Sequence, residues 1–264
     1  MIKTNFHTHT TRCNHASGSD EEYVLAAIQA GFKVLGFSDH NPWKYQSDYV
    51  APSRMELTQM EGYCQSILAL KEKYKSQIEI KLGLECEYFP MYMEWFKDFL
   101  NQYPIDYIIF GNHFYKTDEH RLYYGATCTN SEFLNLYRED CIAGMATGLY
   151  SYLAHPDLFM RADATWTKEK EEISYDICKH ALKYDVPLEY NLNGLALNLM
   201  QGVERYPHPE FFKIAAKVGN QVIIGVDAHI PSLLADETLY QLALKNLKEY
   251  GCNIINEINY QCWK

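Results

Sequence analysis

The stretch IKTNFHTHTTRCNH, residues 2–15, joins a short apolar run to three histidines, two of which are one residue apart. Alternate residues of a strand point to the same side, with their backbones roughly 7 Å apart. If residues 2–6 form a strand, His7 and His9 therefore face one common space. A lone strand histidine is usually a core or rim residue, but a His-x-His pair at a strand end has few structural uses. We interpret the pair as metal ligands.

The same pattern recurs along the chain, because each further apolar run ends in an amide or in a group suited to metal binding. Strand-like runs occupy residues 34–37, 78–84, 107–110, 150–154, 186–190 and 221–226, with a weaker eighth run at 252–258. Helix-like patterns occupy residues 21–31, 56–74, 93–101, 131–145, 168–184, 209–218 and 232–250. This alternation predicts an α/β fold with a mainly parallel sheet. We expect residues 41–54 and 191–208 to be long loops.

In an α/β barrel, the C-terminal ends of the strands form the active-site face. We therefore expect the groups that follow the strands to converge on one basin: His7, His9, Asp39, His40, Glu85, Asn112, His113, His155, Asn191, Asn193, Asp227 and His229. Glu85 competes with Glu87 for the inward direction, and we favour Glu85 because it directly follows its strand. Asp39 and Asp157 are expected to support ligands or turns. Three further histidines are expected to be solvated: His120, His180 and His208.

Buried carboxylates and imidazoles favour a metal centre. Crowding them into a pocket costs several kcal/mol for each unpaired ion, and divalent cations remove this cost by supplying the opposite charge. Nitrogen and oxygen ligands without thiolates suit Zn, Mn or Fe. His15, in the loop after the first strand, is a further candidate ligand. Cys13 and Cys86 lie near the polar residues, but buried free cysteines are common, so we do not include them as ligands.

Composition narrows the class of protein. The 264 residues carry a formal net charge of -10, which argues against nucleic acid and anionic membrane surfaces as partners. We find neither a secretory signal nor a long apolar run. Eight cysteines without a C-x-x-C pair predict reduced thiols and a cytoplasmic location. Because no linker-like tract divides the chain, we expect one domain over residues 1–264. The oligomeric state is left open.

Six short motifs, in order F-H-T-H-T, S-D-H, G-L-E, G-N-H, A-H-P-D and V-D-A-H, resemble those of the polymerase-and-histidinol-phosphatase (PHP) family of metal-dependent phosphoesterases. The resemblance runs from His7 to His229. Each motif is short, but the ordered set is specific. It implies a distorted, TIM-like (β/α)7 barrel that holds two to three divalent metals.

The resemblance also implies a set of ligands, position by position. One metal would be held by His7, His9, Glu85 and Asp227. A second would share Glu85 and add His113 and His155. A third would take His15, His40 and His229. The family places an arginine shortly after the fifth-strand histidine, and Arg161 fits this phosphate-binding position.

The motif E-Y-N-x-x-G-L and the later Y-P are similar to the stand-alone histidinol-phosphate phosphatase branch, which implies hydrolysis of L-histidinol phosphate in histidine biosynthesis. There is one departure, because Ala196 stands where that branch commonly has Arg. Arg205 could substitute from further along, and we include it with Asn191 among the substrate-binding candidates. A metal-bridging hydroxide would attack phosphorus. Either Asp227 or His229 would protonate the leaving alkoxide.

Three alternatives stay open at this point. Ala196 favours a phosphoesterase that acts on another small phosphate or on a nucleotide. Amidohydrolase-type enzymes also open with H-x-H, although they often carry a bridging Lys that is not found here. A barrel that has lost its metals could act as a binding module. The residues 41–54 leave a further choice, because Trp43, Tyr45 and Tyr49 could either line the substrate site or pack against the barrel rim.

Overall fold

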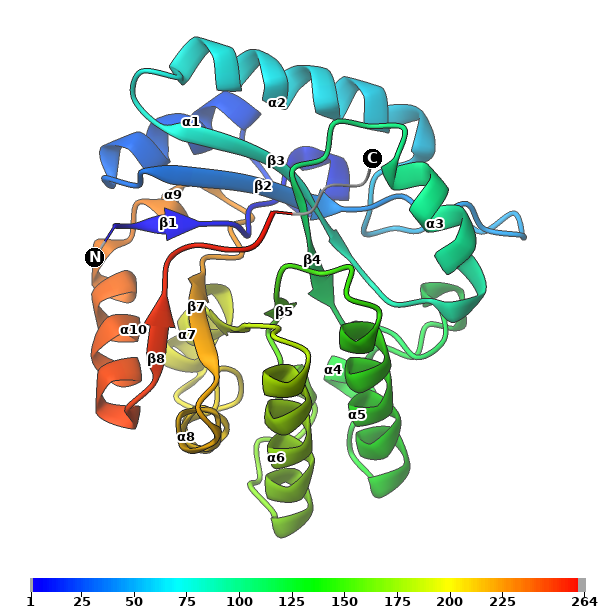
Figure 1. Cartoon of the computed structure of the whole chain (residues 1–264), viewed down its shortest axis with the longest axis vertical. Coiled ribbons are helices and arrows are strands. Elements are labelled where there is room, and N and C mark those ends of the chain that lie inside the picture. Colours follow the sequence, from blue (N-terminus) through cyan, green and yellow to red (C-terminus); the bar gives the residue numbers. More distant parts are fainter. Residues whose placement is uncertain (1, 261–264) are drawn as a thin grey trace.

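The computed structural model describes residues 2–260, which form one eight-stranded sheet. The strands are β1 (Thr4–Asn5), β2 (Val34–His40), β3 (Glu79–Cys86), β4 (Tyr107–Gly111), β5 (Leu153–Ala154), β6 (Leu188–Asn191), β7 (Gln221–Gly225) and β8 (Asn253–Ile255). They pair in sequence order, and every pair is parallel. The predicted parallel, TIM-like α/β fold is confirmed, and the weak eighth run is a strand. The sheet curls inside a layer of helices (Figure 1).

The two ends of the barrel close differently. At the C-terminal ends of the strands, Thr8 forms a parallel bridge with Ala228, and the amide of His9 donates to the carbonyl of Ala228 at 3.0 Å. At the opposite end β8 follows β7, and the hydroxyl of Thr4 donates to the carbonyl of Asn256 at 2.8 Å. Seven strands therefore surround the end where the candidate ligands lie, while β8 fills the gap only at the other end.

The helices return the chain between successive strands and cover the outside of the sheet (Figure 1). They are α1 (Asp20–Gln29), α2 (Met60–Tyr74), α3 (Met93–Leu100), α4 (Tyr124–Thr127), α5 (Ser131–Ala146), α6 (Lys168–Lys183), α7 (Leu192–Gln201), α8 (Pro209–Val218), α9 (Pro231–Leu234) and α10 (Glu237–Tyr250). Ser19 and Glu22 form the capping box that the sequence predicts at the start of α1.

The prediction of a long loop at residues 191–208 is wrong, because α7 occupies its first half. The side chain of Asn191 caps the helix by accepting from the amide of Gly194 at 2.8 Å. Gly194 is itself required, since a Cβ there would meet the carbonyl oxygen of Tyr206 at 2.3 Å. The Asn and Gly residues that suggest a loop are therefore a helix cap and a close contact. Residues 41–54 are irregular, as predicted.

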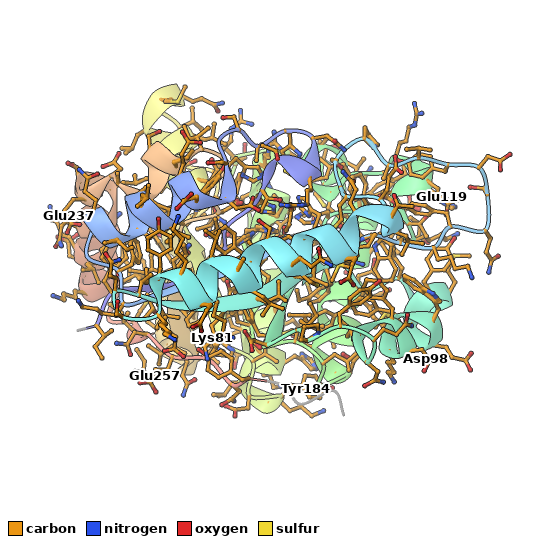
Figure 2. All side chains as sticks on the ribbon, turned by 90° about the horizontal axis from the view of Figure 1, so that it is seen from above. Lys81, Asp98, Glu119, Tyr184, Glu237 and Glu257 are labelled. Atoms are coloured by element: carbon orange, nitrogen blue, oxygen red, sulfur yellow. The ribbon has the colours of Figure 1, made fainter. Side chains whose placement is uncertain are left out.

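The barrel interior is apolar below the candidate site. Tyr107 crosses it, and its hydroxyl lies 2.8 Å from the carbonyl oxygen of Phe6 and 3.1 Å from that of Phe37. Charged residues gather at the periphery, where Figure 2 labels Asp98, Glu119, Glu237 and Glu257. Within residues 2–260, no helix combines the length and the apolar composition needed to cross a membrane.

Candidate metal centre

The centre begins with the two histidines after β1. His7 and His9 are fully buried, and their Nε2 atoms face each other at 3.1 Å. Both nitrogens also approach Oδ1 of Asp227, at 3.5 and 3.2 Å. The other ring nitrogen of His7 lies 2.8 Å from Oε1 of Glu189, which fixes the direction of the ring. The predicted pair therefore does face one space.

Glu85 joins two groups of imidazoles. Its Oε1 lies 2.9 Å from Nε2 of His155 and 3.3 Å from Nε2 of His113. Its Oε2 lies 3.4 Å from Nε2 of His7, 3.5 Å from Nε2 of His9 and 3.1 Å from Nδ1 of His40. Each oxygen thus belongs to a different cluster, and this is the geometry of a carboxylate that bridges two cations.

A third group lies at the mouth of the barrel. His15, His40 and His229 bring one ring nitrogen each to within 4.8 Å of the others. The Nδ1 of His15 lies 2.7 Å from the carbonyl oxygen of Cys13, and that of His229 lies 3.1 Å from the carbonyl oxygen of Asp227. These contacts direct the remaining nitrogens toward the group. The buried Nε2 atom of His229 has no hydrogen-bond partner within residues 2–260.

Two residues of the centre have an unusual backbone. Asp227 and His155 adopt φ values of 53° and 31°, in the left-handed region that residues other than glycine rarely occupy. Such strain persists where the surroundings fix it, commonly at functional sites. Asp227 is fixed by two amides, since Asn191 and Asn193 donate to its Oδ2 at 3.2 and 3.3 Å.

The electrostatics also fit bound cations. Burial by itself would lower the pKa of His7, but three neighbouring carboxylates, Glu189 foremost, raise it to about 10. Burial would raise the pKa of Glu85, but His113 and His7 hold it well below its usual range. Burial lowers the pKa of His229 to about 3. The ionised carboxylate of Glu85 and the neutral imidazole of His229 are forms that bind divalent metals. The raised pKa of His7 shows that the carboxylates around it favour a positive charge at this position, which a cation would also supply.

Three supporting residues of this centre are absent from the set of predicted ligands. The carboxylate of Glu189 lies 2.8 Å from Nδ1 of His7, and that of Glu87 lies 3.0 Å from Nδ1 of His113. Arg54 forms a two-point ion pair with Glu87, at 2.8 and 3.1 Å. A charged residue inside an apolar strand, as in VPLEY at residues 186–190, is the signal that could have revealed Glu189. Glu85 is the inward carboxylate at the centre, whereas Glu87 lies behind His113.

A cavity of about 360 Å³ opens above the centre. Its apolar wall is formed by Phe114, Tyr123, Leu158, Leu197 and Tyr206. Arg161 also lines the cavity, and its guanidinium donates to the hydroxyl of Tyr123 at 2.7 Å. Asn193 also borders the cavity.

The two other substrate-binding candidates lie outside the cavity lining. The guanidinium of Arg205 donates to the carbonyl oxygen of Arg161 at 2.7 Å, so it supports the position of Arg161. The amide of Asn191 is occupied by Glu189, Asp227 and Gly194. In this structure both side chains hold other parts of the site.

Two further expectations concern aromatic and histidine side chains. Trp43 is buried against Phe89, with ring centroids 5.0 Å apart, and its indole donates to Glu87 at 3.0 Å. This is packing against the rim. The prediction that His208 is solvated is wrong, because it is only 7% exposed and its ring stacks on Trp166.

Comparisons with known proteins agree on one family. A family model described as "PHP domain" matches residues 5–193. A Deinococcus radiodurans protein named "Probable histidinol-phosphatase" is 28% identical over 264 residues, which cover 93% of this chain and 92% of that protein. The Bacillus subtilis "Histidinol-phosphatase" is 32% identical over 124 residues, 45% of this chain and 46% of that enzyme. The crystal structure of histidinol phosphate phosphatase from Lactococcus lactis, complexed with zinc, L-histidinol and phosphate, superposes with a TM-score of 0.75 at 20% identity, over 97% of this chain and 98% of that one.

Proposed function

The chain belongs to the PHP domain family, and from this premise we propose that it is a metal-dependent phosphomonoesterase that hydrolyses L-histidinol phosphate to L-histidinol and phosphate. The observation that carries the proposal is the position of Glu85, whose two oxygens face separate imidazole clusters in one buried basin. The similarity to proteins named histidinol-phosphatase supports the choice of substrate.

We assign the predicted ligands to three cation positions. The first is formed by His7, His9, Glu85 and Asp227. The second shares Glu85 and adds His113 and His155. The third is formed by His15, His40 and His229. Nitrogen and carboxylate oxygen donors accept Zn, Mn or Fe. When bound, the cations stabilise charge on the phosphoryl oxygens and lower the pKa of water.

Other side chains bind the phosphoryl group, shape the cavity and supply a proton. Arg161 offers a planar fork that suits two phosphoryl oxygens, and Tyr123 holds that fork toward the cavity. Asn193 reaches the same space and also holds Asp227. The apolar wall that includes Phe114 and Tyr206 excludes water and can receive a flat ring such as imidazole. As the sequence predicts, Asp227 or His229 would pass a proton to the leaving alkoxide.

Purified protein supplied with Mn²⁺ or Zn²⁺ should release phosphate from L-histidinol phosphate far faster than from other phosphate esters. Equal, slow rates on every ester would reject the substrate and leave a broader phosphoesterase. Ala196 and the hydrogen bond of Arg205 to the carbonyl of Arg161 support this second candidate. Among residues 2–260, the only arginine that lines the cavity besides Arg161 is Arg54, which is ion-paired. Nucleotides, other small phosphates and amides belong in the same panel, and cleavage of amides alone would favour the amidohydrolase alternative. We also propose that the enzyme is cytoplasmic.

A further inference from the structure

A buried ion cluster at the edge of the cavity joins three loops. Arg54, from the segment after β2, is 2% exposed. Its Nη2 and Nη1 donate to the two oxygens of Glu87, which follows β3, at 2.8 and 3.1 Å. Its Nε donates to Oδ2 of Asp118, in the segment after β4, at 2.8 Å. Glu87 and Asp118 are 1% and 2% exposed, so all three charges are removed from water.

Arg54 borders the cavity, where an arginine would ordinarily bind phosphate. Four of its five N–H donors, however, already bind other groups of the protein. Besides the two carboxylates, its Nη1 donates to the carbonyl oxygen of Asn41 at 3.0 Å. Binding phosphate through two donors would require breaking part of a buried, charge-assisted network, and such bonds are the strong ones. Arg54 therefore acts on the protein and not on the substrate.

The next contact of the cluster leads to the centre. Oε1 of Glu87, which accepts a hydrogen bond from Nη2 of Arg54, also lies 3.0 Å from Nδ1 of His113. Hydrogen bonding at Nδ1 places the proton there and leaves the Nε2 lone pair free. That Nε2 atom lies 3.3 Å from both Oε1 of Glu85 and Nε2 of His155, at the second cation position.

We propose that Arg54 is a positioning residue for the second cation, acting through Glu87 to orient His113; this inference rests on the proposed function. Without the guanidinium, the carboxylates of Glu87 and Asp118 would keep their contacts with Trp43, His113 and Tyr45 but would lose the arginine charge that both of them share. Breaking a buried ion pair is strongly destabilising for this reason. The carboxylate of Glu87 would then rotate toward water or become protonated. His113 would lose the hydrogen-bond acceptor that fixes the orientation of its ring.

The test measures cation binding and not only turnover. Arg54→Met should lower the affinity for the second cation by about 10–100-fold, as is typical when a residue that hydrogen-bonds to a metal ligand is lost. Equilibrium dialysis against Zn²⁺ should show one cation fewer per chain at limiting metal, with the remaining sites unchanged. Arg54→Lys keeps the charge but not the fork, so it should recover part of the affinity. At saturating metal, KM should stay unchanged in both variants.

Two controls separate positioning from general stability. Asp118→Asn removes the other partner of Arg54 but leaves the path through Glu87, so it should lower the unfolding temperature and leave cation affinity intact. Glu87→Gln should lower the affinity for the second cation as Arg54→Met does. The double variant should bind this cation no more weakly than either single variant, since both changes interrupt the same chain of contacts from Arg54 to His113. If Arg54→Met does not fold, the lysine and glutamine variants carry the test.

A folded Arg54→Met protein that binds every cation with wild-type affinity would overturn the inference. An equal loss of cation affinity in Asp118→Asn would also overturn it, because the cluster would then be only a structural clamp. The proposed function fails differently, when the wild-type protein itself binds no cations or releases no phosphate.

Discussion

At the scale of single residues, Glu85 is the side chain that links the first and second proposed cation positions. It is the only acidic side chain among those described whose two oxygens each approach the Nε2 atoms of two different histidines. Its neighbour Glu87, two positions along, cannot replace it, because Arg54 and His113 occupy both of its oxygens. One carboxylate therefore lies between two of the proposed cation positions, and the next contacts a histidine of the site.

Replacing Glu85 with Gln should remove the bridge while keeping the shape of the side chain. We expect cation content to fall at both the first and the second position. Phosphate release should fall by more than the about 10–100-fold that follows loss of a supporting residue. Metal analysis of the purified variant and its turnover of L-histidinol phosphate check this. Glu79→Gln, an exposed position on the same strand, is the control and should behave as wild type.

His208 should make the protein sensitive to acid. Burial lowers the pKa of His208 from 6.5 to about 4, so the folded state prefers the neutral ring. The stability that this provides is present above pH 6.5 and is lost as the pH falls from 6.5 toward about 4. His208→Asn keeps a side chain that can cap α8 and should flatten the pH dependence in this interval. Urea unfolding midpoints at several pH values test this, and identical slopes in both proteins would contradict it.

The residues that sequence reasoning could place are those that follow strands, because strand ends and ligand types are local signals. His7, Glu85 and His155 belong to this class. Glu189 and Arg54 do not, since their roles depend on contacts with residues far away in the chain. The contact between Glu189 and His7, for example, spans 182 positions. No short window contains both partners.

At the scale of elements, the inner face of β3 is adapted to a large side chain from the neighbouring strand. A Cβ on Gly83 would lie 2.4 Å from ring atoms of Tyr107, and one on Gly36 of β2 would lie 2.2 Å from its hydroxyl oxygen. The absence of side chains at these two positions lets Tyr107 cross the barrel and reach the carbonyls of Phe6 and Phe37. This packing forms the apolar floor beneath the metal centre.

Gly83→Ala should therefore destabilise the protein by about 1–3 kcal/mol, the usual cost of overpacking a core. The matched control is Gly62→Ala in α2, where a Cβ meets nothing within 4 Å. This change should leave stability unaltered or raise it by up to about 1 kcal/mol, because alanine favours helix. Denaturant unfolding measures both. Equal effects of the two substitutions would show that Tyr107 does not set the constraint.

Helix α7 shows that some elements cannot be predicted from the local sequence pattern. Its sequence LNGLALNLMQ mixes Leu, Asn and Gly without a clear polar face. The helix forms because Asn191 caps it and because Leu192 and Leu195 are buried against the core. Tertiary packing thus overrides weak local preference. By contrast, α1 carries its start signal within four residues, from Ser19 to Glu22, and was predictable.

At the scale of the whole molecule, the centre brings together residues that lie far apart in the sequence. Its candidate ligands lie at or just after the C-terminal ends of β1, β2, β3, β4, β5 and β7, and the bridge between Thr8 and Ala228 closes the ring at this end. The chain also carries a net charge of -10, so buried carboxylates such as Glu85 add to an unfavourable balance. Bound cations should therefore stabilise the barrel as well as supply chemistry.

Removing metal should lower the unfolding temperature. A ligand that binds only the folded state stabilises it by about 2.7 kcal/mol at a hundred times its dissociation constant. For a protein of this size each kcal/mol corresponds to about 2–4 °C, so each saturated cation should contribute about 5–10 °C. Calorimetry with Zn²⁺ and then with excess chelator measures the difference. In Glu85→Gln the shift should largely disappear, because two positions lose their common ligand. If chelator leaves the wild-type transition unmoved, cations do not hold these strands together, and the barrel closes through its backbone contacts alone.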